Sequence, residues 1–154
     1  MESSKTPNTL IDLLDQGKSS HPAIVVPGGP TVTYDSLRQQ VQTLSQRLRK
    51  MGIAHNDRVA IVLPNSVEAL IIFLAVATTA TAAPLNAAYK RDEFEFYLAD
   101  ADAKALITSQ KVGTEADKAG PASIIRIDAS SNVHGEIELT TAAHSTTTNP
   151  KASP

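Results

Sequence analysis

Cysteine is absent from this sequence, and so is any excess of basic residues. Without cysteine the chain has no disulfide framework, no thiolate nucleophile and no Cys-ligated zinc or iron–sulfur site. The 14 Lys and Arg residues face 16 Asp and Glu, giving a net charge of -2. No basic stripe is left for a phosphate backbone, so we expect no nucleic-acid partner. Residues 1–8 lack the apolar run of a secretory signal peptide, and we expect a disordered start there.

Charged residues are also missing between Ala69 and Tyr89, a stretch long enough to be weighed as a membrane span. Its strongly apolar part ends near Ala77. The threonines, Pro84 and Asn86 that follow bring polar groups or a missing N–H, which are costly in hydrocarbon. We therefore expect no membrane span, but a buried helix followed by a buried strand.

The chain has 154 residues, 42% of them hydrophobic, which suits one globular domain with its own core. The clearest predicted helix begins at Tyr34, with Thr33 as N-cap and Gly52 as the stop. Its apolar residues recur at steps of three and four: Leu37, Val41, Leu44, Leu48 and Met51. A short helix from Thr9, with Gly17 as a left-handed C-cap, precedes it. A predicted hairpin lies between the two helices, with strands Ala23–Val26 and Thr31–Thr33 around Pro27-Gly28-Gly29-Pro30.

Strands and helices then alternate, which predicts an α/β fold with a mostly parallel sheet flanked by helices. The predicted strands are Val59–Leu63, Thr81–Leu85, Ala105–Thr108 and Ser123–Ile127, the last closed by Asp128 and a Ser-rich turn. The predicted helices are Ala69–Ala77, with an Asn65/Glu68 capping box, then Arg91–Ala101 and a weak helix over Lys111–Ala119. Residues 130–154 contain a Thr/Ser/Ala tract without periodicity and are predicted to be linker-like.

Ligands of open α/β sheets bind beyond the carboxyl ends of the strands, so we expect a site near the loops at Pro64, Leu85 and Ser109. Elsewhere a structural role is favoured. Gly17-Lys18-Ser19 follows a helix, unlike a phosphate loop, and Gly28-Gly29 suits a plain turn. Ser66 lacks a nucleophile elbow and suits a helix-capping role, and Asp100 and Asp102 suit a solvated surface. The histidines show no metal-ligand spacing: His21, His55, His134 and His144. We nominate no catalytic, cofactor-binding or metal-binding residue.

Three blocks of residues occur in order: Thr33-Tyr34-Asp35-Ser36-Leu37, the run from Asn56 to Ser66 (NDRVAIVLPNS), and Pro84-Leu85-Asn86. Together they resemble the opening of the adenylate-forming (AMP-binding) acyl-CoA synthetases, whose members show T-Y-x-E-L, G-D-R-V-A-x-x-x-P-N and P-L-N. Residues 80–89 with Glu93–Leu98 resemble the oxalate–CoA ligase branch of fungi and plants. The chain departs from the family at Asp35, Asn56 and Thr79, which concerns packing rather than membership.

The resemblance covers about residues 9–154 and implies the N-terminal part of an ATP-dependent carboxylic acid–CoA ligase. Such an enzyme forms an acyl-adenylate with release of pyrophosphate and then transfers the acyl group to CoA, with magnesium offsetting phosphate charge. The implied substrates are ATP, CoA and a carboxylate, with oxalate favoured. On this basis residues 9–129 are an incomplete N-terminal subdomain of an AMP-binding domain, and residues 130–154 are a linker-like or truncated end.

The family's phosphate loop, adenine-binding segment, ribose-binding Asp and catalytic Lys have no match in this chain. We therefore expect that it binds no cofactor by itself and is inactive alone, with the missing downstream half as a partner. Two alternatives stay open: a non-catalytic α/β module that binds a partner through an open sheet edge, and a truncated relic. Many full-length relatives are peroxisomal, but Ala152-Ser153-Pro154 is no such address, so location is left open with the cytoplasm as default.

Overall fold

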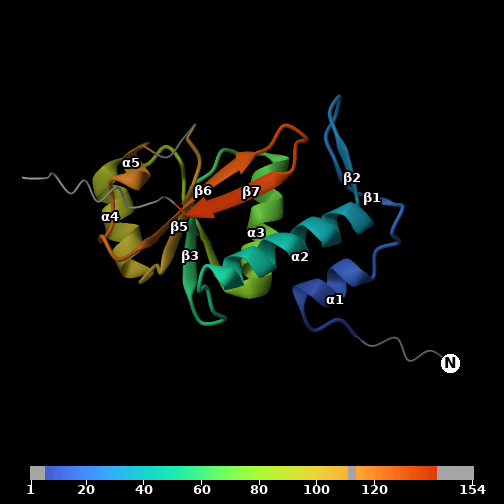
Figure 1. Ribbon diagram of the computed structural model, residues 1–154, viewed down its shortest axis with the longest axis horizontal. Helices are drawn as coiled ribbons and strands as arrows, with labels where there is room; N and C mark the ends of the chain where they lie inside the picture. The colour runs from blue at the N-terminus through green and yellow to red at the C-terminus, as the bar shows by residue number, and fades with distance from the viewer. Residues whose placement is uncertain (1–5, 111–113, 142–154) are drawn as a thin grey trace, which may run out of the picture.

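A computed structural model describes residues 6–110 and 114–141 of the chain (Figure 1). Its longest helix, α2 (Tyr34–Lys50), confirms the helix predicted from the apolar spacing. The Thr33 hydroxyl accepts a hydrogen bond from the Ser36 N–H at 3.2 Å, and Gly52 follows the helix at φ +90°. The apolar stripe of this helix is buried in the core, as its period requires.

The short first helix, α1 (Leu10–Asp15), begins at a capping box between Thr9 and Asp12. Its predicted left-handed C-cap at Gly17 is wrong, because Gln16 ends the helix in right-handed geometry and Gly17 has no positive φ. The small size of Gly17 serves packing instead, since a Cβ there would overlap the ring of Tyr34.

The predicted hairpin is confirmed as an antiparallel pair of strands, β1 (Pro22–Val25) and β2 (Thr31–Thr33). Gly28 lies in the turn between them at φ +69°, a conformation that favours glycine. The plain-turn interpretation of Gly28-Gly29 therefore holds. The hairpin lies beside the start of α2 and outside the main sheet (Figure 1).

The main sheet of the described residues has five strands in the order β4-β3-β5-β6-β7. The first four strands are parallel, as predicted: β4 (Thr81–Pro84), β3 (Arg58–Ile61), β5 (Ala105–Thr108) and β6 (Ile125–Ser131). The fifth strand, β7 (Ile137–Thr141), runs antiparallel to β6. The fold class is therefore α/β with a mostly parallel sheet.

Helices cover both faces of this sheet. Helices α2 and α3 (Val67–Thr79) pack on the face that carries Val59, Ile61 and Ile107. Helices α4 (Arg91–Asp100) and α5 (Thr114–Asp117) lie over the other face, which carries Ala60, Val62 and Leu106. Adjacent residues of β3 thus belong to opposite core clusters, which explains its unbroken apolar run.

Several predicted boundaries need correction. The N-cap of α3 is Ser66 and not Asn65. β4 is an edge strand with Thr81 and Pro84 exposed, so it is not fully buried as predicted. β6 continues through Asp128 to Ser131, where the sequence predicts a turn.

The linker-like interpretation is also wrong for the described part of residues 130–154, because β6 and β7 form a hairpin there. Residues 142–154 lie outside the described residues, as do residues 1–5 and 111–113, on which parts of the predicted disordered start and weak helix fall. In the described ranges no helix is both long and apolar enough to cross a membrane.

Candidate functional site

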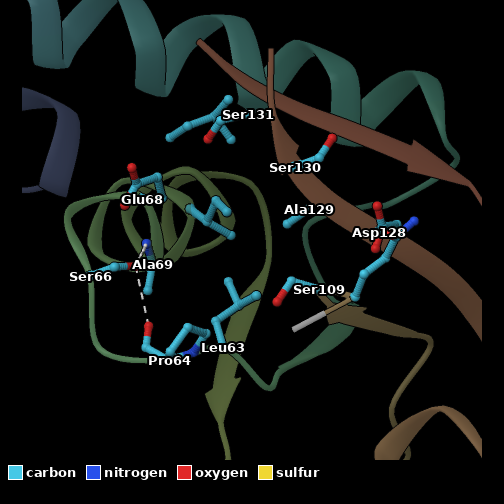
Figure 2. A pocket seen from close by; sticks show the side chains of 13 residues that line it. Leu63, Pro64, Ser66, Glu68, Ala69, Ser109, Asp128, Ala129, Ser130 and Ser131 are labelled. Carbon is cyan, nitrogen blue, oxygen red and sulfur yellow. Dashed lines mark hydrogen bonds between the residues drawn. The ribbon is translucent and has the colours of Figure 1, made fainter. Parts of the chain in front are cut away.

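A cavity of about 510 Å³ lies at the carboxyl ends of β3, β5 and β6 (Figure 2). From β3 the chain goes to β4 on one side of β3, and it then crosses to β5 on the other side of β3. This reversal of strand order is the place where α/β sheets usually bind ligands. Two of the three loops named from the sequence, at Pro64 and Ser109, line the cavity, whereas Leu85 is not among its described lining residues.

The cavity has an apolar floor and a polar rim. The floor comes from the end of β3, the inner face of α3 and the β6–β7 hairpin: Leu63, Ala69, Ile72, Ala129 and Ile137. The rim carries hydroxyl, carboxamide and carboxylate groups, namely Ser66, Glu68, Gln110, Asp128, Ser130 and Ser131, whereas the Ser109 hydroxyl lies inside. Apolar surface combined with converging polar groups is found in small-molecule sites.

The two serines named in the loops have different roles. Ser66 Oγ accepts a hydrogen bond from the Ala69 N–H at 3.0 Å and donates one to the Pro64 carbonyl at 3.2 Å. This geometry confirms its predicted role as a helix cap. Ser109 Oγ is buried and has no hydrogen-bond partner among the residues that the structure describes. A buried hydroxyl without a partner is uncommon in folded proteins and calls for an explanation.

The charge around the cavity is negative. Glu68 stands on one side of the opening and Asp128 on the other, in Figure 2. No Lys, Arg or His is present among the described residues that line it. The cavity therefore offers no cation to a phosphate or carboxylate ligand.

The Gly17-Lys18-Ser19 segment binds a side chain of the protein itself. The Arg38 guanidinium donates hydrogen bonds of 2.8 Å to the carbonyls of Leu14 and Gly17 and to Ser19 Oγ. The segment follows α1 and precedes a strand, so it lacks the strand-to-helix setting of a phosphate loop. Its role is structural, because the hydrogen bonds from Arg38 hold the end of α1 against α2.

The other candidate residues are not brought together. His21, His55 and His134 are exposed on separate loops, and His144 lies outside the described residues. Asp100 and Asp102 are exposed at the end of α4, as expected for a solvated surface. The described ranges contain no group of three or more His, Cys, Asp or Glu side chains that could hold a metal ion.

An ion pair lies at the amino ends of β3 and β5, on the side of the sheet away from the cavity, and the sequence patterns did not predict it. Lys104 Nζ lies 3.0 Å from Asp57 Oδ2, and the same oxygen accepts a hydrogen bond from the Ala54 N–H at 2.6 Å. The hydrogen bond from Ala54, followed by that from Lys104, lowers the pKa of Asp57 below its ordinary value. The sequence did contain a signal for this ion pair. Asp57 directly precedes β3 and Lys104 directly precedes β5, and the amino ends of neighbouring parallel strands lie close together.

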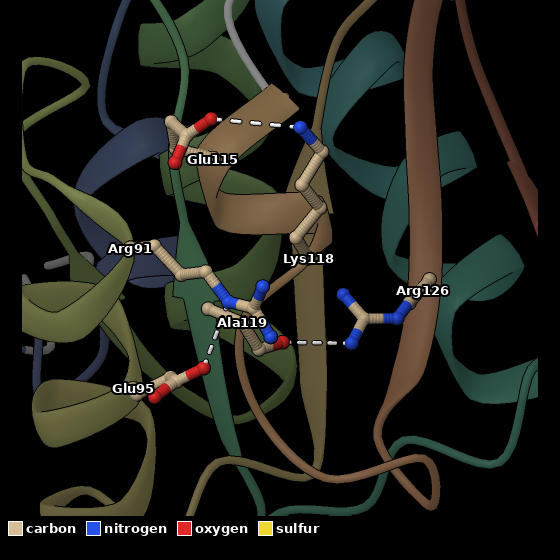
Figure 3. Close-up of polar contacts among 6 residues, drawn as sticks. All are labelled: Arg91, Glu95, Glu115, Lys118, Ala119 and Arg126. Atoms are coloured by element: carbon tan, nitrogen blue, oxygen red, sulfur yellow. Dashed lines mark hydrogen bonds and ion pairs between the residues drawn. The ribbon is translucent and has the colours of Figure 1, made fainter.

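Polar contacts on the far face are structural (Figure 3). Arg91 pairs with Glu95 at 3.0 Å and Lys118 with Glu115 at 3.6 Å, all with exposed side chains. Arg126 donates a hydrogen bond of 2.7 Å to the carbonyl of Ala119 and thereby ties β6 to the end of α5. Exposed pairs of this kind contribute little stability, and none of these residues lines the cavity at the carboxyl ends of the strands.

Comparison with known proteins gives consistent matches. The family model described as AMP-binding enzyme matches residues 14–154. The chain is 43% identical over 117 residues to the oxalate–CoA ligase of Arabidopsis thaliana, covering 73% of this chain and 23% of the relative. It is 44% identical over 102 residues to a probable CoA ligase of Humulus lupulus, covering 66% of this chain and 19% of the relative.

The same fold occurs in solved structures. A benzoate CoA ligase from Burkholderia xenovorans LB400 superposes with a TM-score of 0.65 at 19% identity, over 78% of this chain and 24% of that chain. At this identity the likeness concerns the fold alone. The chain thus spans about a fifth to a quarter of the length of these relatives.

Proposed function

This chain belongs to the AMP-binding enzyme family, and from that premise we propose that it is the N-terminal part of an ATP-dependent carboxylic acid–CoA ligase, with oxalate as the favoured acid. The observation that carries the proposal is the 43% identity to an oxalate–CoA ligase over 73% of this chain. The reaction proposed for the whole protein joins the acid to ATP with release of pyrophosphate and then transfers the acyl group to the CoA thiol.

The triphosphate of ATP does not fit the cavity of the described residues. A triphosphate needs cationic or N–H donors around it, whereas this cavity is lined by Glu68 and Asp128 without a basic side chain. We therefore assign no described residue to catalysis and derive no step of the reaction from this cavity. The proposed contribution of this chain is the α/β subdomain against which the rest of the ligase packs.

An interaction module that works through an open sheet edge is less well supported, because both edges of the described sheet are blunted. At β4, Thr81 and Leu85 donate their N–H groups to β3, so the outward positions are Ala82 and Pro84, and proline has no N–H. At β7, Arg47 Nε donates a hydrogen bond of 2.9 Å to the Leu139 carbonyl. A short strand with proline and an edge covered by a charged side chain both disfavour strand addition.

A chimera tests the proposal. The region of the Arabidopsis oxalate–CoA ligase that aligns with this chain is replaced by this chain, and pyrophosphate release is measured with ATP, magnesium, CoA and oxalate. We expect oxalate-dependent release, because a subdomain that is 43% identical in the aligned region should present a similar surface to the remainder of the ligase. Acetate and benzoate in place of oxalate check that the remainder of the Arabidopsis ligase keeps its own choice of acid.

The matched control is a chimera carrying Phe94→Ala, which disrupts the core of the same segment. A soluble, folded chimera without oxalate-dependent release contradicts the proposal that this chain is the N-terminal part of such a ligase. The favoured acid is tested on the complete ligase that is proposed to contain this chain: pyrophosphate release with acetate or benzoate but not with oxalate overturns oxalate as the favoured acid.

A further inference from the structure

We propose that the cavity at the carboxyl ends of β3, β5 and β6 binds a small neutral molecule that carries an amide or hydroxyl group on an apolar body. This site goes beyond the proposed ligase function, which places no ligand in it. Its volume of about 510 Å³ lies within the range of about 300–1,000 Å³ that holds small ligands. Its location at the reversal of strand order is the usual one for ligands of α/β sheets.

The buried hydroxyl of Ser109 indicates the polar part of the ligand. Figure 2 shows this hydroxyl directed into the space between β5 and the start of α3, beside Leu63. Its oxygen is buried and has no hydrogen-bond partner among the described residues. A hydroxyl can donate one hydrogen bond and accept two, so a ligand group that both donates and accepts suits it well. Neutral amides and alcohols have this property.

The floor of the cavity indicates the rest of the ligand. Leu63, Ala69 and Ile72 line one side, and Ala129 and Ile137 line the other. These side chains cannot hydrogen-bond, so they favour an alkyl body over a polyol or a sugar. Burial of each CH₂ group of the ligand against them contributes to affinity.

The charges around the cavity disfavour anionic ligands. Glu68 and Asp128 are both carboxylates, and the described residues that line the cavity include no cation to offset them. An anionic ligand such as oxalate therefore meets repulsion without a paired charge. Glu68 is exposed to solvent, so its attraction for a cationic ligand is screened as much as its repulsion of an anion, and the polar group buried inside the cavity, the Ser109 hydroxyl, is uncharged. The neutral class is thus favoured.

Titration of the chain with isosteric probes, followed by ¹H–¹⁵N NMR, tests the proposal. The probes are pentanamide, pentanoate and pentylammonium, which share an alkyl body and differ in head-group charge. We expect pentanamide to shift the amide signals of Ala69, Ser109 and Ser131, and to bind at least tenfold more tightly than pentanoate. Equal or tighter binding of pentanoate or pentylammonium overturns the neutral class, and shifts confined to another surface overturn the site.

Two variants sharpen the result. Ser109→Ala removes the unpaired hydroxyl and is expected to weaken pentanamide binding about three- to tenfold, as loss of one hydrogen bond predicts. Ser123→Ala, at an exposed serine before β6, is the matched control and is expected to leave binding unchanged. Unchanged binding in a folded Ser109→Ala variant overturns the role of the hydroxyl. The titration does not depend on ligase activity, so this proposal and the proposed function fail separately.

Discussion

Gly17 packs against the ring of Tyr34, and this contact requires a residue without a side chain. A Cβ at this position would overlap the ring of Tyr34, the first residue of α2. We therefore expect Gly17→Ala to lower the free energy of unfolding by about 1–3 kcal/mol, as overpacking does. Urea denaturation measures the effect. In a Tyr34→Ala background the same substitution should cost much less, and an equal cost in both backgrounds would show that the ring is not the cause.

Asp57 gives a prediction about pH. Its pKa is lowered in the folded state, first by the hydrogen bond from the Ala54 N–H and then by Lys104. A lowered folded-state pKa stabilises the protein above the ordinary Asp value, and this stabilisation is lost as the pH falls through the folded-state pKa. We expect Asp57→Asn, which keeps an acceptor but loses the charge, to lower Tm at pH 7.

The difference in Tm between Asp57→Asn and the unmodified chain should shrink as the pH falls below the ordinary Asp value of 3.8. Asp100→Asn, at an exposed aspartate on the last turn of α4, is the control and should leave Tm unchanged. A difference that is the same at pH 7 and at the acid end would rule out the ionised carboxylate as the source of the stability.

For single residues, the sequence predicts which kind of hydrogen bond a side chain can make better than it predicts which group the side chain will contact. Asn65 and Ser66 are both good N-caps, and the choice depends on the path that the chain takes away from β3 past Pro64. The role of Ser66 as a cap can be predicted because hydroxyl-to-N–H bonding is local. The unpaired hydroxyl of Ser109 could not be predicted, because it depends on α3 and β6 standing away from it.

Helix α4 offers a matched pair of phenylalanines two residues apart. Phe94 is 1% exposed and packs between the sheet and the end of α5, whereas Phe96 is 63% exposed. We expect Phe94→Ala to lower the free energy of unfolding by about 3–5 kcal/mol because it leaves a cavity in the core. Phe96→Ala should change it by less than about 0.5 kcal/mol. Urea denaturation with circular dichroism measures both, and similar effects would contradict the orientation of α4.

Elements held by local signals could be predicted, and those held by distant partners could not. The periodicity, cap and stop of α2 all lie within its own segment, so its bounds follow from the sequence. β7 is stabilised by pairing with β6 and by the hydrogen bond from Arg47, which is far away in the sequence. Its alternating Ile137 and Leu139 after the turn at Gly135 are a weak signal beside a Thr-rich tract.

For the whole molecule, the alternation of strands and helices is enough to predict a parallel sheet and the edge at which a cavity would lie. The strand order explains why that inference succeeds for the Pro64 and Ser109 loops and not for Leu85. β3 and β5 are neighbours and their loops meet, whereas β4 lies at the outer edge of the described sheet. Sequence periodicity carries no information on this order, so the three loops could not be ranked.

The charge of the cavity leads to a prediction for the isolated chain. Pyrophosphate release from ATP requires groups that neutralise and align the phosphates, and the described cavity presents two carboxylates instead. We expect the purified 154-residue chain to release no pyrophosphate above background with ATP, magnesium, CoA and oxalate, in a coupled pyrophosphate assay. The Arabidopsis oxalate–CoA ligase is the positive control for the assay. ATP-dependent release that increases with chain concentration and disappears in Phe94→Ala would contradict this prediction and require a phosphate site within this chain.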